Sequence, residues 1–278
     1  MKFLDKHVSE THISFRNRLW LYAFGIVVLF LLIVPSLVVI PMSFSASQYL
    51  EFPPKNWSFR WYENYFLGGK VASGFNDWMG ATWTSLKVAV LTIFVATPVG
   101  TMAAYGIINS DSKIRKILFP IMISPIMVPV ILVAIGLFYF YVKFQMVNSV
   151  LGLVLGHSLV SMPLVLIIVL SALKNYDMNQ EKVARSLGAT RLRAFFEITL
   201  PQIKFSIISS SLIAFLTSFD EVIISLFVAG GDNSTITRAM FLALRDQIDP
   251  TIAAISTILI VISSGLLILS QLYGTKKE

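Results

Sequence analysis

Long apolar stretches separated by short polar segments dominate the chain. Six of these stretches are long enough to cross a membrane, since a helix needs about 20 apolar residues to span about 30 Å of hydrocarbon. They lie at residues 19–40, 83–108, 117–141, 150–173, 205–227 and 252–273. The pattern therefore predicts an all-α membrane protein with six transmembrane helices.

These spans divide the chain into a series of segments. We expect a cytoplasmic N-terminal segment at 1–18, a first transmembrane helix at 19–40 and a periplasmic loop at 41–80. A core of five transmembrane helices at 81–273 and a cytoplasmic tail at 274–278 follow. The first span is longer than the apolar core of a signal peptide, which is roughly 7–15 residues, so we expect it to be retained.

Composition agrees with a membrane protein. The chain is 56% hydrophobic and 13% charged, whereas soluble domains average roughly 25% charged residues. It contains no cysteine, which excludes disulfides, thiolate metal sites and thiol nucleophiles. The net charge of +7 comes from basic residues clustered between the spans, which favours a membrane protein over a nucleic-acid-binding one.

The distribution of basic residues predicts the orientation. Fifteen of the 22 Lys and Arg residues fall on the side that holds both termini and the loop at 174–204. Because cytoplasmic loops carry an excess of Lys and Arg, we expect this side, with both termini, to face the cytoplasm.

The loop between the fourth and fifth spans carries the most informative pattern. Asp177 or Asn179 can cap a short helix, and Gly188 can end it in a left-handed turn. An apolar stripe and a set of polar residues share this helix. The stripe is Val183, Ala184 and Leu187, and the polar residues are Glu181, Lys182 and Arg185. Such a helix can bury one side in a groove of a partner.

A spaced motif follows. Gly188 is separated by nine residues from Ile198-Thr199-Leu200-Pro201. With the flanking run Ala184 to Ala189, this resembles the EAA loop of type I ABC importer permeases, in which a Glu-Ala-Ala triplet precedes the glycine. Lys182 and Val183 stand here in place of the Glu and the first Ala, and Glu181 lies one position early.

The resemblance implies a MetI-like permease fold, with an EAA coupling loop at 177–201 that seats in a cytoplasmic ATPase. The residues that it assigns to coupling are Glu181, Lys182, Ala184, Arg185, Leu187, Gly188, Ala189, Ile198, Leu200 and Pro201. It also implies a location in a bacterial inner membrane, a dimer of ATP-binding subunits, a second homologous permease in a heterodimer, and a periplasmic solute-binding protein. The chain holds no G-x-x-x-x-G-K-[ST] phosphate loop. We therefore expect a non-enzymatic chain without a cofactor, with ATP and Mg bound by the partner.

Two acidic residues, Asp220 and Glu221, interrupt the fifth span. A charge inside a membrane costs roughly 2.5–3.5 kcal/mol on insertion scales, so such a residue usually faces a cavity or the bundle interior. With Phe219, the two acids form a candidate substrate path that attracts a cationic solute. The alternative is a structural ion pair with Arg238, Arg245 or a partner chain.

The segment at 218–222 resembles the polyamine branch of these permeases, which implies spermidine or putrescine as the substrate. Related branches that carry opines, aminophosphonates or amino acid derivatives remain alternatives. A channel or secondary transporter fits the spans and the acids equally well but leaves the docking loop without a role. An intramembrane enzyme lacks motif support, since HExxH and GxSxG are both absent.

Three further features have two interpretations each. His157 either lines the path or forms hydrogen bonds between helices. Pro125 and Pro129 either kink a gating helix or serve simple packing. The aromatic residues of the outward loop suit either the membrane interface or a recognition site. They are Trp57, Trp61, Tyr62, Tyr65 and Trp78.

Overall fold

A computed structural model describes residues 15–68, 77–246 and 248–274. Regular structure in these residues is helical, apart from an isolated antiparallel bridge between Ser45 and Trp57. Most of the expected N-terminal segment at 1–18 and of the expected tail at 274–278 lies outside the described residues. The first helix begins at Phe15, before the expected start of the first span.

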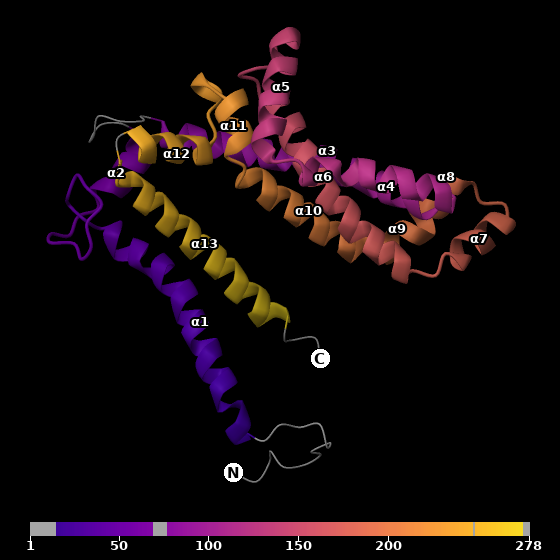
Figure 1. The fold of residues 1–278 in the computed structure, drawn as a ribbon, viewed down its shortest axis with the longest axis horizontal. Helices are drawn as coiled ribbons and strands as arrows, with labels where there is room; N and C mark the ends of the chain where they lie inside the picture. Colours follow the sequence, from indigo (N-terminus) through magenta and orange to yellow (C-terminus); the bar gives the residue numbers. More distant parts are fainter. Residues whose placement is uncertain (1–14, 69–76, 247, 275–278) are drawn as a thin grey trace. The chain divides into compact units, whose positions relative to one another are not determined.

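Figure 1 shows the helices in the order of the chain, with a long connection at 43–59 between the first two. In chain order they are α1 (Phe15–Met42), α2 (Arg60–Leu67), α3 (Trp78–Ile108), α4 (Ser112–Met127), α5 (Val130–Phe144), α6 (Val150–Asn175), α7 (Asn179–Ser186), α8 (Arg191–Ala194), the π-helix η1 (Phe195–Thr199), α9 (Leu200–Gln202), α10 (Lys204–Phe219), α11 (Ile223–Val228), the 3-10 helix η2 (Gly231–Asn233), α12 (Ile236–Asp246) and α13 (Thr251–Gly274).

The chain forms two compact units. One comprises Met1–Ala72 with Ile248–Glu278, and the other comprises Ser73–Gln247. Helix α13, which we expected in the five-helix core, therefore groups with α1 and α2. The coupling loop and the acidic pair both belong to the second unit.

In the first unit, hydrogen bonds join α2 to the start of α13. Asn64 Nδ2 donates to Thr251 Oγ1 at 2.8 Å, and Thr251 Oγ1 donates to Asp249 Oδ1 at 2.6 Å. Trp61 and Tyr65 of α2 are buried, whereas Trp57 is exposed. The outward aromatic residues therefore divide between the interior and the surface.

Helices α3, α6 and α10 form the centre of the second unit. Their contact is close because small residues face larger ones, as is common between membrane helices. A Cβ placed on Gly100 of α3 would lie 2.7 Å from Val165 Cγ1 of α6, which is too close for any side chain there. The buried core comprises Ala96, Ala104, Ile107, Val165, Leu166, Val169, Leu170, Leu173, Ile203 and Ala214.

A second buried cluster joins α5 and α11 to the long helices α3 and α6. It contains Val88 of α3, Ala134 of α5, Leu153 of α6, and Ile224 and Val228 of α11. Through this cluster, the short helix α11 is fixed beside α5 and α6, although it has only six residues.

The six expected spans correspond to six helical stretches, but only some are single helices. In the described residues, α1 from Leu19, α3 and α6 are long and apolar enough to cross a membrane. Two bent helix pairs bring the number to five if each pair is one span. The sixth stretch lies in α13, which runs from Thr251 to Gly274 and is apolar over Thr251–Gly265.

The third expected span, 117–141, is sharply bent. Helices α4 and α5 meet at 95° (Figure 1), and Pro129 lies at the N-cap of α5. Proline has no N–H and pushes the preceding residue into extended conformation, which Val128 adopts with φ −86° and ψ 133°. A continuous helix over 117–141 was therefore wrong, and of the two prolines only Pro129 lies at the bend.

The fifth expected span is also divided. Just before the expected start of this span at 205, the segment Arg191–Gln202 meets α10 at 79°, with Ile203 at the bend. Helix α10 then ends at Phe219 and α11 begins at Ile223. The acidic pair therefore lies in a break between two helices, and not on one continuous helix as we expected.

Candidate functional site

The loop helix α7 has both of the predicted boundaries. Asp177 Oδ1 accepts a hydrogen bond from the N–H of Asn179 at 3.0 Å, so Asp177 is the candidate whose side chain binds a free N–H at the start of the helix, directly before the N-cap position Met178. Gly188 has φ +98°, the left-handed conformation that favours glycine. Gly188 N donates to Arg185 O and Ala189 N donates to Ala184 O, both at 3.1 Å. This pair of bonds is a Schellman motif, which satisfies the last carbonyls of the helix.

Glu181 is the only described residue of α7 that is buried, with 2% of its surface exposed. Its carboxylate accepts a hydrogen bond from Tyr105 Oη at 2.5 Å and another from Thr199 Oγ1 at 2.9 Å. Tyr105 belongs to α3 and Thr199 to η1, so one side chain ties the loop helix to two other elements. Buried carboxylates require such donors, because an unpaired buried charge is very unfavourable.

Tyr105 is the centre of this anchor. Its ring lies 4.6 Å from the ring of Phe195, and the guanidinium of Arg191 lies 5.7 Å from its centroid. A second contact ties α7 to α9, since Gln202 Nε2 donates to Gln180 Oε1. The loop helix is therefore attached to α3, to η1 and to α9 by side-chain hydrogen bonds.

The apolar stripe of α7 points away from this anchor. Val183 is 59% exposed and Leu187 is 85% exposed, while Ala184 is half-buried. Beyond Gly188, Leu192 and Phe196 are also exposed. The helix buries its carboxylate and exposes its apolar residues, which is the reverse of what an isolated soluble domain would do. A surface of this kind is typical of a protein–protein interaction site.

The remaining coupling candidates differ in how far they are exposed. Lys182, Arg185, Gly188 and Pro201 are exposed, whereas Ala189, Ile198 and Leu200 are half-buried. Because Pro201 has no N–H, it cannot continue the helical hydrogen bonding of the residues before it. The π-helical turn of η1 directly precedes it, and such turns accompany interrupted ladders. The exit from the loop is therefore an irregular helix that leads to the bend at Ile203.

The acidic pair lies at the break between α10 and α11. Glu221 Oε1 accepts hydrogen bonds from the N–H groups of Ile223 and Ile224, at 2.8 and 3.0 Å, so Glu221 caps α11. Asp220 is exposed at the C-cap of α10. The half-buried Phe219 stacks on Phe215 with ring centroids 5.9 Å apart. Of the two acids, only Asp220 presents a carboxylate without a structural task in the described residues.

The basic residues considered as partners for these acids lie elsewhere. Arg238 Nη1 donates to Ser234 Oγ at 3.1 Å, and Arg245 pairs with Asp246 at 3.0 Å. Burial lowers the pKa of Arg238 from its ordinary value. In the part of the chain that the structure describes, no ion pair includes Asp220 or Glu221. In this structure, Arg238 and Arg245 therefore bond to other residues and not to the acidic pair.

His157 holds the two sides of the break together. Its Nδ1 lies 2.9 Å from Ser218 Oγ of α10, and its Nε2 lies 3.2 Å from Ser225 Oγ of α11. Ser218 Oγ also donates to Thr92 Oγ1 of α3 at 3.2 Å. His157 is 1% exposed, so its interpretation as a hydrogen-bonding residue between helices is confirmed.

Sequence reasoning missed most of this anchoring network. It counted Glu181 among the polar residues of the loop helix and did not consider Tyr105, Thr199 or the Gln180–Gln202 contact. Tyr105 is the only tyrosine of α3 and lies near its end, which is a weak signal for a polar contact. Nothing in the sequence relates it to a glutamate 76 positions later.

The long apolar helices define a class, a multi-pass helical membrane protein. The chain belongs to the family of binding-protein-dependent transport system inner membrane components, whose family model matches residues 96–275. This match includes the whole of the predicted coupling loop and the acidic pair. The resemblance to ABC importer permeases is therefore confirmed, as is the all-α permease fold.

Named relatives agree with this family. The chain is 26% identical over 256 residues to the spermidine/putrescine transport system permease protein PotC of Haemophilus influenzae, covering 92% of this chain and 96% of the relative. It is 29% identical over 236 residues to the putrescine transport system permease protein PotI of Escherichia coli K12, covering 82% and 81%.

A solved structure supports the fold alone. One chain in the crystal structure of a bacterial ABC transporter involved in the import of the acidic polysaccharide alginate has a TM-score of 0.63 and 13% identity. The similarity covers 96% of this chain and 99% of that chain.

Proposed function

We propose that this chain is the permease subunit of an ATP-driven importer and that the loop at 177–201 couples it to an ATPase. The observation that carries the proposal is the two-sided character of α7. Val183 and Leu187 are exposed, while Glu181 is bonded to Tyr105 and Thr199. A partner that binds the exposed side and moves α7 would therefore displace α3 and η1 with it.

The proposed assembly has several partners. The ATPase is a dimer of cytoplasmic subunits that bind ATP and Mg, a second homologous permease completes the solute path, and a periplasmic binding protein delivers the solute. The family description refers to binding-protein-dependent transport and supports the last of these. The excess of Lys and Arg beside the loop supports a cytoplasmic location for it and for both termini.

We propose a polyamine such as spermidine or putrescine as the solute. The relatives whose names refer to these compounds support this assignment, because they match most of the chain. The exposed carboxylate of Asp220 agrees with a cationic solute, since an intramembrane acid without a partner favours a passing cation. Import of another amino compound by the same machinery is the alternative, and Asp220 fits it equally well. A channel or secondary transporter would leave the exposed stripe of α7 without a partner.

Replacing Gly188 tests the coupling role. The backbone of Gly188 lies in the left-handed region, but a Cβ there would meet nothing within 4 Å. Gly188→Val therefore strains the turn without a steric clash, at a cost of about 1–3 kcal/mol. We expect uptake per ATP hydrolysed to fall by about tenfold or more in the assembled complex, since each 1.4 kcal/mol is tenfold in an equilibrium.

Gly106→Val is the matched control. Gly106 also has open space around its Cβ position, but it lies within α3 and its backbone has no left-handed φ. We expect normal coupling from this variant. Normal uptake by a correctly assembled Gly188→Val complex would contradict the proposed role of the loop.

A further inference from the structure

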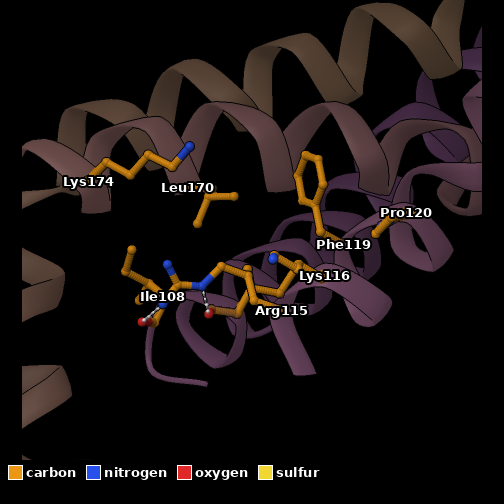
Figure 2. Close-up of a pocket in the computed structure, with 8 residues that line it drawn as sticks. Ile108, Arg115, Lys116, Phe119, Pro120, Leu170 and Lys174 are labelled. Carbon is orange, nitrogen blue, oxygen red and sulfur yellow. Dashed lines mark hydrogen bonds between the residues drawn. The ribbon is translucent and has the colours of Figure 1, made fainter. Parts of the chain in front are cut away.

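A cavity of about 230 Å³ lies in the second unit where three helices end or begin (Figure 2). It is formed by the end of α3, the first half of α4 and the end of α6. The same end of α3 carries Tyr105, the anchor of the loop helix. The lining residues are Ile107, Ile108, Arg115, Lys116, Phe119, Pro120, Leu170 and Lys174.

The interior of the cavity is apolar. Ile107 and Leu170 belong to the buried core, and Phe119 packs against that core. On the neighbouring surface of α4, Ile117 and Ile121 are largely exposed, so the apolar lining continues onto a face suited to hydrocarbon. A ligand that fits here has an apolar part.

The rim of the cavity is cationic. Arg115, Lys116 and Lys174 contribute three positive charges, and Figure 2 shows Lys116 and Lys174 on different helices. No carboxylate is among the lining residues, and no ion pair in the described residues includes any of the three. Asp111, which precedes α4, does not line the cavity. A ligand that fits here also has an anionic part.

Arg115 has a structural role that separates it from the two lysines. Its Nε donates to Ile107 O at 3.2 Å, and its Nη2 donates to Ile108 O at 3.0 Å and to Ser110 O at 3.2 Å. These bonds satisfy the free carbonyls at the end of α3. The guanidinium keeps its charge beside the cavity, but the two lysines are the residues available for a ligand.

We propose that this cavity binds an anionic phospholipid, with the phosphate at Lys116 and Lys174 and the start of an acyl chain over Ile107, Phe119 and Leu170. Basic pockets between membrane helices on the cytoplasmic side suit anionic headgroups. A polyamine is excluded from this cavity because three like charges repel it. The inference rests on the proposed membrane orientation, which places this end of α3 at the inner leaflet.

Lipid retention by the assembled importer tests the site. The complex is taken from nanodiscs of phosphatidylcholine with a minor fraction of phosphatidylglycerol, and native mass spectrometry counts the phosphatidylglycerol that remains bound. The double variant Lys116→Gln with Lys174→Gln should weaken this retention by about tenfold or more. Each basic residue near an anionic surface contributes about 1 kcal/mol of binding free energy, and about 1.4 kcal/mol is tenfold in affinity. Lys113→Gln, on the same helix but outside the cavity, is the control and should leave retention unchanged.

Several outcomes would overturn the site. Equal loss in Lys113→Gln would mean general attraction to the surface, and unchanged retention in the double variant would mean that the cavity holds no lipid. Displacement by inorganic phosphate as effective as displacement by short-chain phosphatidylglycerol would identify a simple anion site. Chemical acylation can also be used to probe both lysines in lipid-free samples. If the ATPase alone protects them from the reagent, the cavity is a protein contact and not a lipid site. Loss of the lipid with normal ATP-driven uptake leaves the proposed transport function intact.

Discussion

The carboxylate of Glu181 accepts hydrogen bonds from two residues that are distant in the sequence, Tyr105 and Thr199. Its position one residue before the expected motif glutamate agrees with this inward role, because adjacent positions on a helix point about 100° apart. Lys182, which occupies the motif position, is exposed. The residue that anchors the loop and the residue available to a partner are therefore neighbours.

Removal of the Glu181 carboxylate should loosen the loop helix. In Glu181→Ala, the hydroxyls of Tyr105 and Thr199 lose their acceptor, and each buried unsatisfied group costs about 1–3 kcal/mol. We expect a lower midpoint of thermal unfolding and less uptake per ATP hydrolysed, and Glu181→Gln should restore much of both because it keeps an acceptor oxygen.

The control for this experiment is Glu197→Gln on the same loop. Glu197 forms an exposed ion pair with Arg193 at 3.0 Å, and such pairs contribute about 0–1 kcal/mol. It should leave uptake per ATP unchanged. A Glu181→Ala complex that couples as well as the Glu197→Gln complex would exclude the anchoring role.

At the scale of helices, the break between α10 and α11 is fixed from outside its own segment. His157 of α6 bonds to Ser218 before the break and to Ser225 after it. Glu221 then supplies the local cap of α11. In the sequence, the two acids indicated an interruption of the apolar span. Periodicity alone could not decide whether they lie within one helix or in a gap between two helices, because both arrangements give two polar positions with apolar residues on either side.

Loss of His157 should let α11 open locally. The chain has no native cysteine, so Ala229→Cys, at the buried C-cap of α11, provides a single label site. We expect His157→Leu to increase the rate of thiol labelling there by about thirtyfold, because two hydrogen bonds of about 1 kcal/mol each are lost and each 1.4 kcal/mol is tenfold.

Ser161→Ala serves as the comparison on the same helix. Ser161 Oγ donates only to the backbone carbonyl of His157, one turn earlier, so its loss should leave the labelling rate of the cysteine unchanged. Equal labelling in the His157→Leu and Ser161→Ala proteins would show that the break is held by its own backbone and cap.

At the scale of the whole molecule, the identity of the transported solute has to be measured on the assembled importer. Solute-stimulated ATPase activity across a panel of polyamines, opines and aminophosphonates should be highest for polyamines. Asp220→Asn should reduce stimulation by cationic solutes by about tenfold, since loss of one charge contact in a low-dielectric site costs about 1–3 kcal/mol.

Asp232→Asn is the matched control for this measurement, because Asp232 is also an exposed acid of the second unit, in η2. It should leave the stimulation unchanged. Full stimulation of the Asp220→Asn complex by spermidine and putrescine would reject the electrostatic role of Asp220 and leave the import machinery as proposed.

The sequence by itself determined the membrane class, the places of the long apolar stretches, and the capped loop helix that ends at Gly188. These depend on apolar length and on local backbone preferences, which act between residues a few positions apart. Only the tertiary structure decided that Glu181 is buried, that His157 fixes the break, and that α13 groups with α1 and α2. These depend on contacts between residues from 18 to 187 positions apart, and no local pattern specifies which distant donor reaches a given side chain.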